Sequence, residues 1–165
     1  MKCPVSLLIA FGVVAAGCAP SEEEFLDQHE EDFRSALSLV HAMPGIQSMS
    51  FEGSMGCRGG RFVNGDFVEA TGDPPNSCAG RPLLPVELVV QRTGAPPSTY
   101  QALAALLDST VLWRVGKTTE GGWIYVQEPR GPAGYFIYSD EEPTSVFGSR
   151  PPRHVRGPWH WSPAD

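Results

Sequence analysis

Residues 111–127 read VLWRVGKTTEGGWIYVQ, and this stretch decides the fold class. Its first five residues alternate and are rich in β-branched and aromatic side chains, which predicts a strand with Val111, Trp113 and Val115 on one face. A polar turn with two glycines follows, and the chain returns as a second strand from Trp123 onward. The pattern therefore predicts an antiparallel hairpin.

The same reasoning adds further strands elsewhere in the chain. Asn64-Gly65 tolerates the positive φ of a type I′ turn, so the flanking triplets RFV and DFV are expected to pair as a second hairpin. Residues 135–138 (YFIY) are apolar on both faces, which predicts a central or covered strand. The remaining predicted strands are residues 46–51 (IQSMSF) and residues 86–91 (VELVVQ).

A long amphipathic helix is expected near the start of the domain. Ser21 and Glu24 have the spacing of a capping box, which closes unpaired N–H groups at a helix start. From Phe25 onward apolar residues recur with a period of 3.6, so the helix is predicted over residues 22–42, where Pro44 and a glycine stop it.

A second capping-box spacing, Ser98 with Gln101, predicts another helix that ends at about Asp108. Together these elements indicate an α+β fold with two helices packed on one face of an antiparallel sheet. The strand, helix and strand expected over residues 86–115 also permit one parallel crossover. A mixed, ferredoxin-like sheet is therefore the alternative.

The first 18 residues carry a targeting signal. A lysine at position 2 precedes an apolar run over residues 5–16, which is shorter than the roughly 20 residues of a membrane span and has the length of a secretory signal. The run ends in AAGC, residues 15–18, which resembles the lipobox of bacterial lipoproteins. The resemblance implies cleavage after Gly17 and a diacylglyceryl thioether on Cys18.

This resemblance also implies how the chain is organised. A signal peptide would cover residues 1–17 and a lipidated tether residues 18–20, followed by a single domain over 21–165 with a proline-rich tail from about 148. The protein is then expected in the cell envelope, held by acyl chains such as palmitate on the extracytoplasmic side of a bacterial membrane. The alternative is an ordinary signal peptide that leaves Cys18 as a free thiol.

The cysteine count fits the lipoprotein interpretation. Cys3 would leave with the leader and Cys18 would be acylated, so that one pair remains, Cys57 and Cys78. We predict a disulfide between them, which would stabilise the domain by roughly 3 kcal/mol by restricting the unfolded chain. A zinc or redox pair is disfavoured because the sequence has no C-x-x-C and no histidine close to either cysteine.

The net charge of the chain argues against one class of partner, the nucleic acids. The net charge of −7 argues against nucleic acid, which requires a basic surface. Residues 22–32 contain seven acidic residues and no basic one, whereas residues 148–161 contain three arginines and no acidic residue. We expect a solvated acidic helix face and a separate proline-rich tail. The alternative is a tail that folds back over the acidic helix.

Motifs for chemistry are missing from the sequence. It contains no H-E-x-x-H, no G-x-S-x-G, no P-loop and no G-x-G-x-x-G. We therefore expect no metal and no cofactor, and favour binding over catalysis.

Aromatic residues gather in the second half of the chain. Trp123 and Tyr125 would share one strand face, as would Trp159 and Trp161, and such rings anchor protein partners or stack on sugars when they are exposed. A place in the core is the alternative for all of them. The residues predicted to form an interaction surface are Trp123, Tyr125, Arg153, Arg156, Trp159 and Trp161.

The expected function is a membrane-anchored binding or accessory module of the envelope, whose partners are the membrane, through the lipid, and a protein or a glycan. Replacement of Trp159 and Trp161 by alanine should then abolish partner binding without unfolding the domain. The alternative function is a cell-wall protein that binds or hydrolyses glycans.

Overall fold

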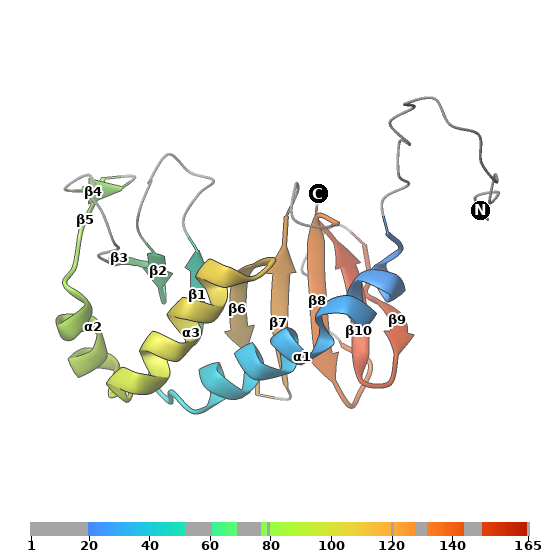
Figure 1. Ribbon diagram of the computed structural model, residues 1–165, viewed down its shortest axis with the longest axis horizontal. Coiled ribbons are helices and arrows are strands. Elements are labelled where there is room, and N and C mark those ends of the chain that lie inside the picture. Colours follow the sequence, from blue (N-terminus) through green and yellow to red (C-terminus); the bar gives the residue numbers. More distant parts are fainter. Residues whose placement is uncertain are drawn as a thin grey trace, which may run out of the picture.

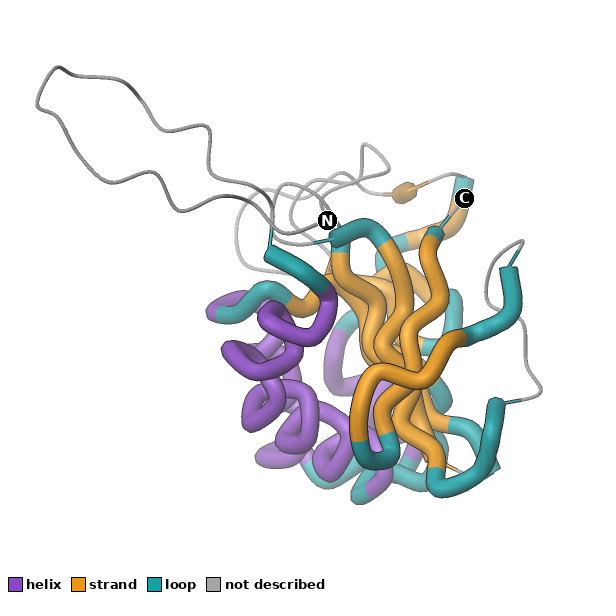
Figure 2. The backbone as a smooth tube through the Cα atoms, turned by 90° about the vertical axis from the view of Figure 1, so that its right-hand side faces the viewer, coloured by secondary structure: helices purple, strands orange, loops and turns teal. Residues whose placement is uncertain are grey.

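The computed structural model has an antiparallel sheet and three helices in the residues that it describes, and the first and third helices pack on one face of the sheet (Figures 1 and 2). These residues are 20–51, 61–68, 77–78, 80–119, 121–127, 132–143 and 150–164. The helices are α1 (Glu22–His41), α2 (Val86–Thr93) and α3 (Pro97–Ser109). The strands of the sheet are β1 (Ser48–Phe51), β2 (Arg61–Val63), β3 (Asp66–Val68), β6 (Leu112–Lys117), β7 (Gly121–Val126), β8 (Gly134–Ser139), β9 (Arg153–Arg156) and β10 (Trp159–Pro163). A separate ladder joins β4 (Ser77–Cys78) to β5 (Arg81–Pro82).

The strands follow the order β3-β2-β1-β6-β7-β8-β10-β9, and each neighbouring pair is antiparallel. The hairpin predicted over residues 111–127 is β6 and β7 at the middle of the sheet, and the predicted central strand is β8. The C-terminal hairpin of β9 and β10 forms one edge (Figure 1). The α+β class and the antiparallel sheet are confirmed, and the mixed alternative with a parallel crossover is wrong for the described strands.

The segment VELVVQ, which was expected to be a strand, begins helix α2 instead. Its valines satisfy the helical spacing i, i+3, i+4 at Val86, Val89 and Val90, and so short an apolar run does not distinguish a helix from a strand. Its boundaries decide the matter: Pro85 precedes the first turn, and Gly94 ends the helix at φ 65° in the left-handed region. The parallel crossover that was the alternative for residues 86–115 therefore lacks its first strand.

Helix α3 confirms the second predicted helix but not its predicted start. Pro96 is the N-cap residue and Pro97 occupies the first turn, where its fixed φ suits the helix and its missing N–H costs nothing. Ser98 lies inside the first turn, so the capping box expected from Ser98 and Gln101 is wrong.

Helix α1 matches its prediction. The Glu24 N–H donates to Ser21 Oγ at 3.2 Å, and the Ser21 N–H donates to Glu24 Oε2 at 2.9 Å, which is the reciprocal capping box. Past the other end, the Lys117 ammonium from β6 donates to the carbonyls of Met43 at 2.7 Å and Pro44 at 3.2 Å, and fixes α1 to the sheet. The buried side chains of α1 are Phe25, Leu26, Phe33, Ala36, Leu37 and Val40.

The hairpin of β2 and β3 turns at Asn64 and Gly65, as predicted. Both residues have positive φ, 53° and 88°. The Asn64 side chain also holds the chain before β1: its Oδ1 accepts from the Gln47 N–H at 2.7 Å, and its Nδ2 donates to the Gly45 carbonyl at 2.7 Å.

An irregularity in β6 changes the predicted strand face. The pairing of β6 with β7 shifts register between Leu112 and Arg114, so one extra residue enters β6 there. Leu112 and Val115 consequently face the helices and are fully buried, while Trp113 is half-buried. The predicted common face of Val111, Trp113 and Val115 is therefore wrong.

The core lies between the sheet and the helices. Met49, Val115, Ile124 and Phe136 point from neighbouring strands toward α1 and α3, and each is 0% exposed. On the opposite face of the sheet no helix is formed by the residues that the structure describes (Figure 2). Among the described residues no helix combines the length and the apolar character that a bilayer crossing requires.

Two predictions fall on parts of the chain that the structure does not describe. Residues 1–19, which include the predicted signal peptide and Cys18, lie outside the described residues, and so do Cys57 and the side chain of Cys78. The lipid anchor and the disulfide stay predictions.

Candidate binding surfaces

The structure separates the predicted interaction residues into two groups on opposite faces of the sheet. Trp159 and Trp161 share a strand face as predicted, but this face points toward α1, and they are 1% and 4% exposed. Trp159 packs edge-on against Phe33 with 6.0 Å between ring centroids, and Trp161 lies 4.7 Å from Phe136. They are core residues, so the prediction of an exposed pair that could be removed without unfolding the domain is wrong.

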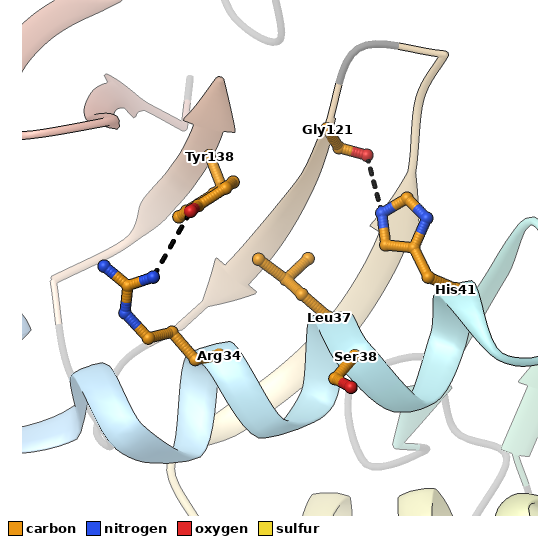
Figure 3. Close-up of a pocket in the computed structure, with 6 residues that line it drawn as sticks. All are labelled: Arg34, Leu37, Ser38, His41, Gly121 and Tyr138. Atoms are coloured by element: carbon orange, nitrogen blue, oxygen red, sulfur yellow. Dashed lines mark hydrogen bonds between the residues drawn. The ribbon is translucent and has the colours of Figure 1, made fainter. Parts of the chain in front are cut away.

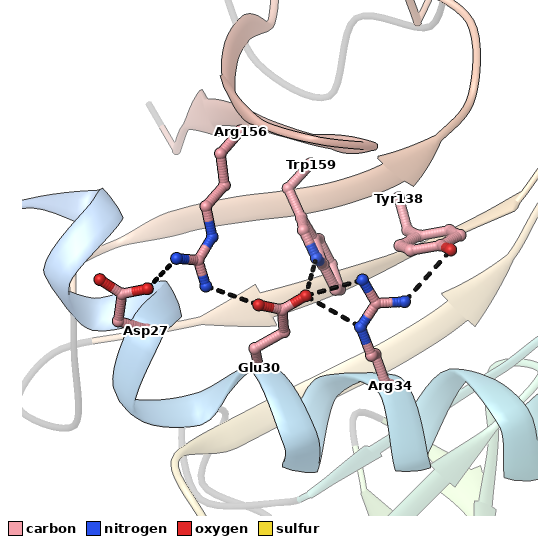
Figure 4. Close-up of polar contacts among 6 residues, drawn as sticks. All are labelled: Asp27, Glu30, Arg34, Tyr138, Arg156 and Trp159. Atoms are coloured by element: carbon pink, nitrogen blue, oxygen red, sulfur yellow. Dashed lines mark hydrogen bonds and ion pairs between the residues drawn. The ribbon is translucent and has the colours of Figure 1, made fainter.

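Arg156 of the C-terminal hairpin binds the acidic side of α1 (Figure 4). Arg156 pairs with both Asp27 and Glu30. The other Glu30 oxygen, Oε1, accepts from the Trp159 indole N–H at 3.1 Å and pairs with Arg34 Nη2 at 2.7 Å. The tail therefore folds back over the acidic helix, and the expectation of a separate tail is wrong.

A second ion pair joins the two segments near the start of α1. Arg153 Nη2 lies 2.7 Å from Glu22 Oε2. Burial alone would raise the pKa of Glu22, but the hydrogen bond and the charge of Arg153 together hold this pKa below its usual value. The two predicted arginines thus have internal acidic partners, and we assign Arg153 and Arg156 to the stability of the fold.

A shallow hollow lies beside these contacts, between α1 and the ends of β7 and β8 (Figure 3). Its volume is about 240 Å³, and its lining consists of Arg34, Leu37, Ser38, His41, Gly121 and Tyr138. The Arg34 Nη1 group donates to the Tyr138 hydroxyl at 3.3 Å. The Gly121 carbonyl accepts from His41 Nε2 at 3.0 Å, which places a proton on that nitrogen. These hydrogen bonds join α1 to β7 and β8, as expected where a helix packs on a sheet.

The other predicted pair, Trp123 and Tyr125, lies on the sheet face opposite the helices, as predicted for one strand face. Tyr135 on β8 joins them: its ring centroid is 4.8 Å from that of Tyr125 and 5.9 Å from that of Trp123. The Arg114 guanidinium on β6 lies over the Trp123 ring, 5.3 Å from its centroid. We call Arg114, Trp123, Tyr125 and Tyr135 the aromatic strip.

The position of Trp123 in the aromatic strip depends on a glycine in the neighbouring strand. Gly116 pairs with Trp123 across β6 and β7, and a Cβ on Gly116 would overlap the indole. The tryptophan therefore lies directly against the backbone of the neighbouring strand. All three rings of the strip are half-buried and Arg114 is exposed, so each of the four side chains has surface in contact with solvent. Burial raises the pKa of the Tyr125 hydroxyl, and the electrostatic effect of the neighbouring Tyr135 raises it further.

Two histidines lie further along the same face, toward the β9 edge. The rings of His154 and His160 are 5.4 Å apart. Burial, followed by the neighbouring His154, lowers the pKa of His160. Within the described residues no group of three side chains is arranged to ligate a metal ion.

Sequence reasoning identified two members of the aromatic strip and missed the other two. The sequence pattern places Arg114 in a strand without indicating a role, and it predicts Tyr135 on a strand that is central or covered. Comparison with known proteins does not add a role: no family model, no curated protein and no solved structure matches this chain. A function must therefore be argued from the chain's own residues.

Proposed function

We propose that the protein is a binding module of the bacterial cell envelope, held at the membrane by a lipid on Cys18, and that it binds through the aromatic strip. The single observation that carries the proposal is the strip itself, three neighbouring rings and a guanidinium partly open to solvent on the sheet face that no described helix covers. Aromatic and arginine side chains supply most of the binding energy at protein surfaces.

The sequence before α1 supports the proposed anchor. Cys18 precedes the N-cap residue Ser21 by three residues, which even when fully extended span only about 11 Å. The residues 15–18 match the lipobox pattern, and two or three acyl chains would hold the domain at a bilayer permanently. A module on so short a tether would meet ligands close to the membrane surface.

The described sheet positions of this face favour binding over hydrolysis. Glycoside hydrolysis requires two carboxyl groups about 5–9.5 Å apart. The side chains that surround the strip on neighbouring strands are serines, glycines and Ile137, and no carboxylate stands at a described sheet position of this face.

Two measurements test the proposal. Labelled palmitate should appear on the protein, and Cys18→Ala should release it from the membrane fraction. A photo-crosslinking amino acid at Tyr125 should capture a ligand in intact cells, and the same amino acid at Gln28, exposed on α1, serves as the matched control. Failure of acylation together with equal crosslinking at both positions would overturn the proposal.

A further inference from the structure

The chemistry of the aromatic strip points to a particular class of ligand. The faces of aromatic rings carry partial negative charge, and they attract the weakly positive C–H groups of a sugar ring. Trp123, Tyr125 and Tyr135 place three such rings within 6 Å of a neighbour on adjacent strands. Ser48 and Ser50 from β1 pair with Gly116 and Arg114 on the same face, so two hydroxyl groups stand next to Arg114 at one side of the strip. Rings with a guanidinium and hydroxyls at one side suit a saccharide better than the apolar centre of a protein interface.

The charge of this face restricts the class of ligand further. Arg114 is the one side chain with a fixed charge at the described sheet positions of this face, in a protein whose net charge is −7. Its guanidinium donates to Ser48 Oγ at 3.3 Å and lies over Trp123, so it is held beside the rings. The planar guanidinium group forms paired hydrogen bonds with a carboxylate. A single positive group next to stacked rings is complementary to a sugar that carries a carboxylate.

We propose that the aromatic strip binds a glycan with carboxylate groups, with sugar rings packed against the side chains of Trp123 and Tyr125 and a carboxylate on Arg114. This inference rests on the proposed function, because it names the ligand of the same surface. It also assigns a purpose to Gly116: the absent side chain lets Trp123 lie against β6, and this brings the indole and Arg114 together.

Calorimetric titration of the full chain in detergent micelles tests the inference directly. Tri-galacturonate should bind, and its methyl ester, which has the same sugar rings without charge, should bind at least tenfold more weakly. Poly-glutamate, which carries carboxylates without sugar rings, should not bind measurably. Equal affinity for acid and ester, or equal affinity for poly-glutamate, would overturn the inference.

Matched variants separate the two halves of the site. Trp123→Ala should weaken the binding of both acid and ester at least tenfold, whereas Arg114→Gln should remove the difference between them. Gln28→Ala on the exposed side of α1 should leave binding unchanged. Since Trp123 is half-buried, Tyr125→Ala provides a second ring variant, and thermal melting shows that each variant is folded. Unchanged affinity in folded Trp123→Ala and Tyr125→Ala would contradict the inference.

Sedimentation with purified peptidoglycan, a glycan polymer that carries carboxylates, extends the test to an envelope material. The wild-type chain should sediment with it and the Arg114→Gln chain should remain in the supernatant. If no saccharide binds but the crosslinker at Tyr125 captures a protein, the inference fails and the proposed function stands. If saccharides bind but the chain is never acylated, the membrane anchor fails and the ligand class stands.

Discussion

The two faces of the sheet carry the same kinds of side chain in different surroundings. On the helix-covered face, Phe33, Phe136 and Trp159 form a ring cluster with at most 1% of each residue exposed. On the opposite face, Trp123 and Tyr125 also contact other rings, but they remain half-buried beside an exposed arginine. An aromatic pair in a sequence therefore does not indicate a binding surface until the element that covers it is known.

The largest expected difference between the faces concerns stability. Trp159→Ala removes a fully buried ring and the hydrogen bond from its indole to Glu30, so the free energy of unfolding should fall by about 3–5 kcal/mol. Tyr125→Ala on the opposite face should cost about 1 kcal/mol or less, because the ring is already partly solvated. Urea titrations of the two variants measure both values, and similar losses would contradict the division between the faces.

A glycine substitution tests whether the open face also needs close packing. Gly116→Ala places a methyl group in the space of the Trp123 indole and should cost about 1–3 kcal/mol. Ser50→Ala on the neighbouring strand, the matched control, should have little effect. Adding Trp123→Ala to the glycine variant should restore most of the lost stability, because the overlapping ring is gone. A penalty that persists in the double variant would refute this explanation.

The ion pairs between α1 and the C-terminal hairpin should contribute less. Glu30→Ala leaves Arg156, Arg34 and the Trp159 N–H without their shared acceptor, and the loss should be about 1–2 kcal/mol because these groups are partly solvated. Glu31→Ala, its exposed neighbour, should change stability by less than about 0.5 kcal/mol. A chemical denaturation curve for each variant provides the comparison.

The smallest effect is a dependence on pH. The folded pKa of His160 lies below the unfolded value of about 6.5, so the unfolded chain binds more protons between these two values. Stability should therefore decrease as the pH falls from about 6.5 to the folded pKa, and stay level below it. The groups around His160 act in both directions: His154 lowers its pKa, while Glu142 and the Pro158 backbone raise it.

The variant His160→Gln isolates this contribution. The difference in unfolding free energy between wild type and His160→Gln, measured from pH 8 to pH 5, should shrink or reverse toward acid because only the wild type loses stability there. His154→Gln should retain part of the slope. If the difference in unfolding free energy is constant with pH, the pKa of His160 is not lowered by folding and the prediction is wrong.

Sequence patterns predicted much of this fold because local signals were strong. The Ser21–Glu24 capping box, the Asn64-Gly65 turn and the alternation in WIYV each specify a local geometry that tertiary contacts did not override. The VELVVQ segment failed because its valines fit two periods, and only Pro85 and Gly94 distinguish them.

The candidate site was less accessible to prediction because it depends on contacts between distant residues. The sequence leaves Trp159 between an interaction surface and the core because no sequence pattern reveals that β10 lies under α1. Trp123 and Tyr125 share one strand face, as the sequence predicts, but Arg114 joins them only through the pairing of β6 with β7, and the shifted register at Leu112 conceals that relation in the sequence. Long-range packing also decides whether an arginine forms an ion pair within the domain, as Arg156 does with Glu30.

The contacts between α1 and the C-terminal hairpin have a consequence for the order of folding. Glu30 meets Arg156 and Trp159 across separations of 126 and 129 residues, so α1 is completed by strands that are synthesised much later. Until β10 leaves the ribosome, the apolar side of α1 lacks its contact with Trp159. Contacts at such large sequence separations slow folding, so the packing of α1 is completed only after β9 and β10 have been synthesised.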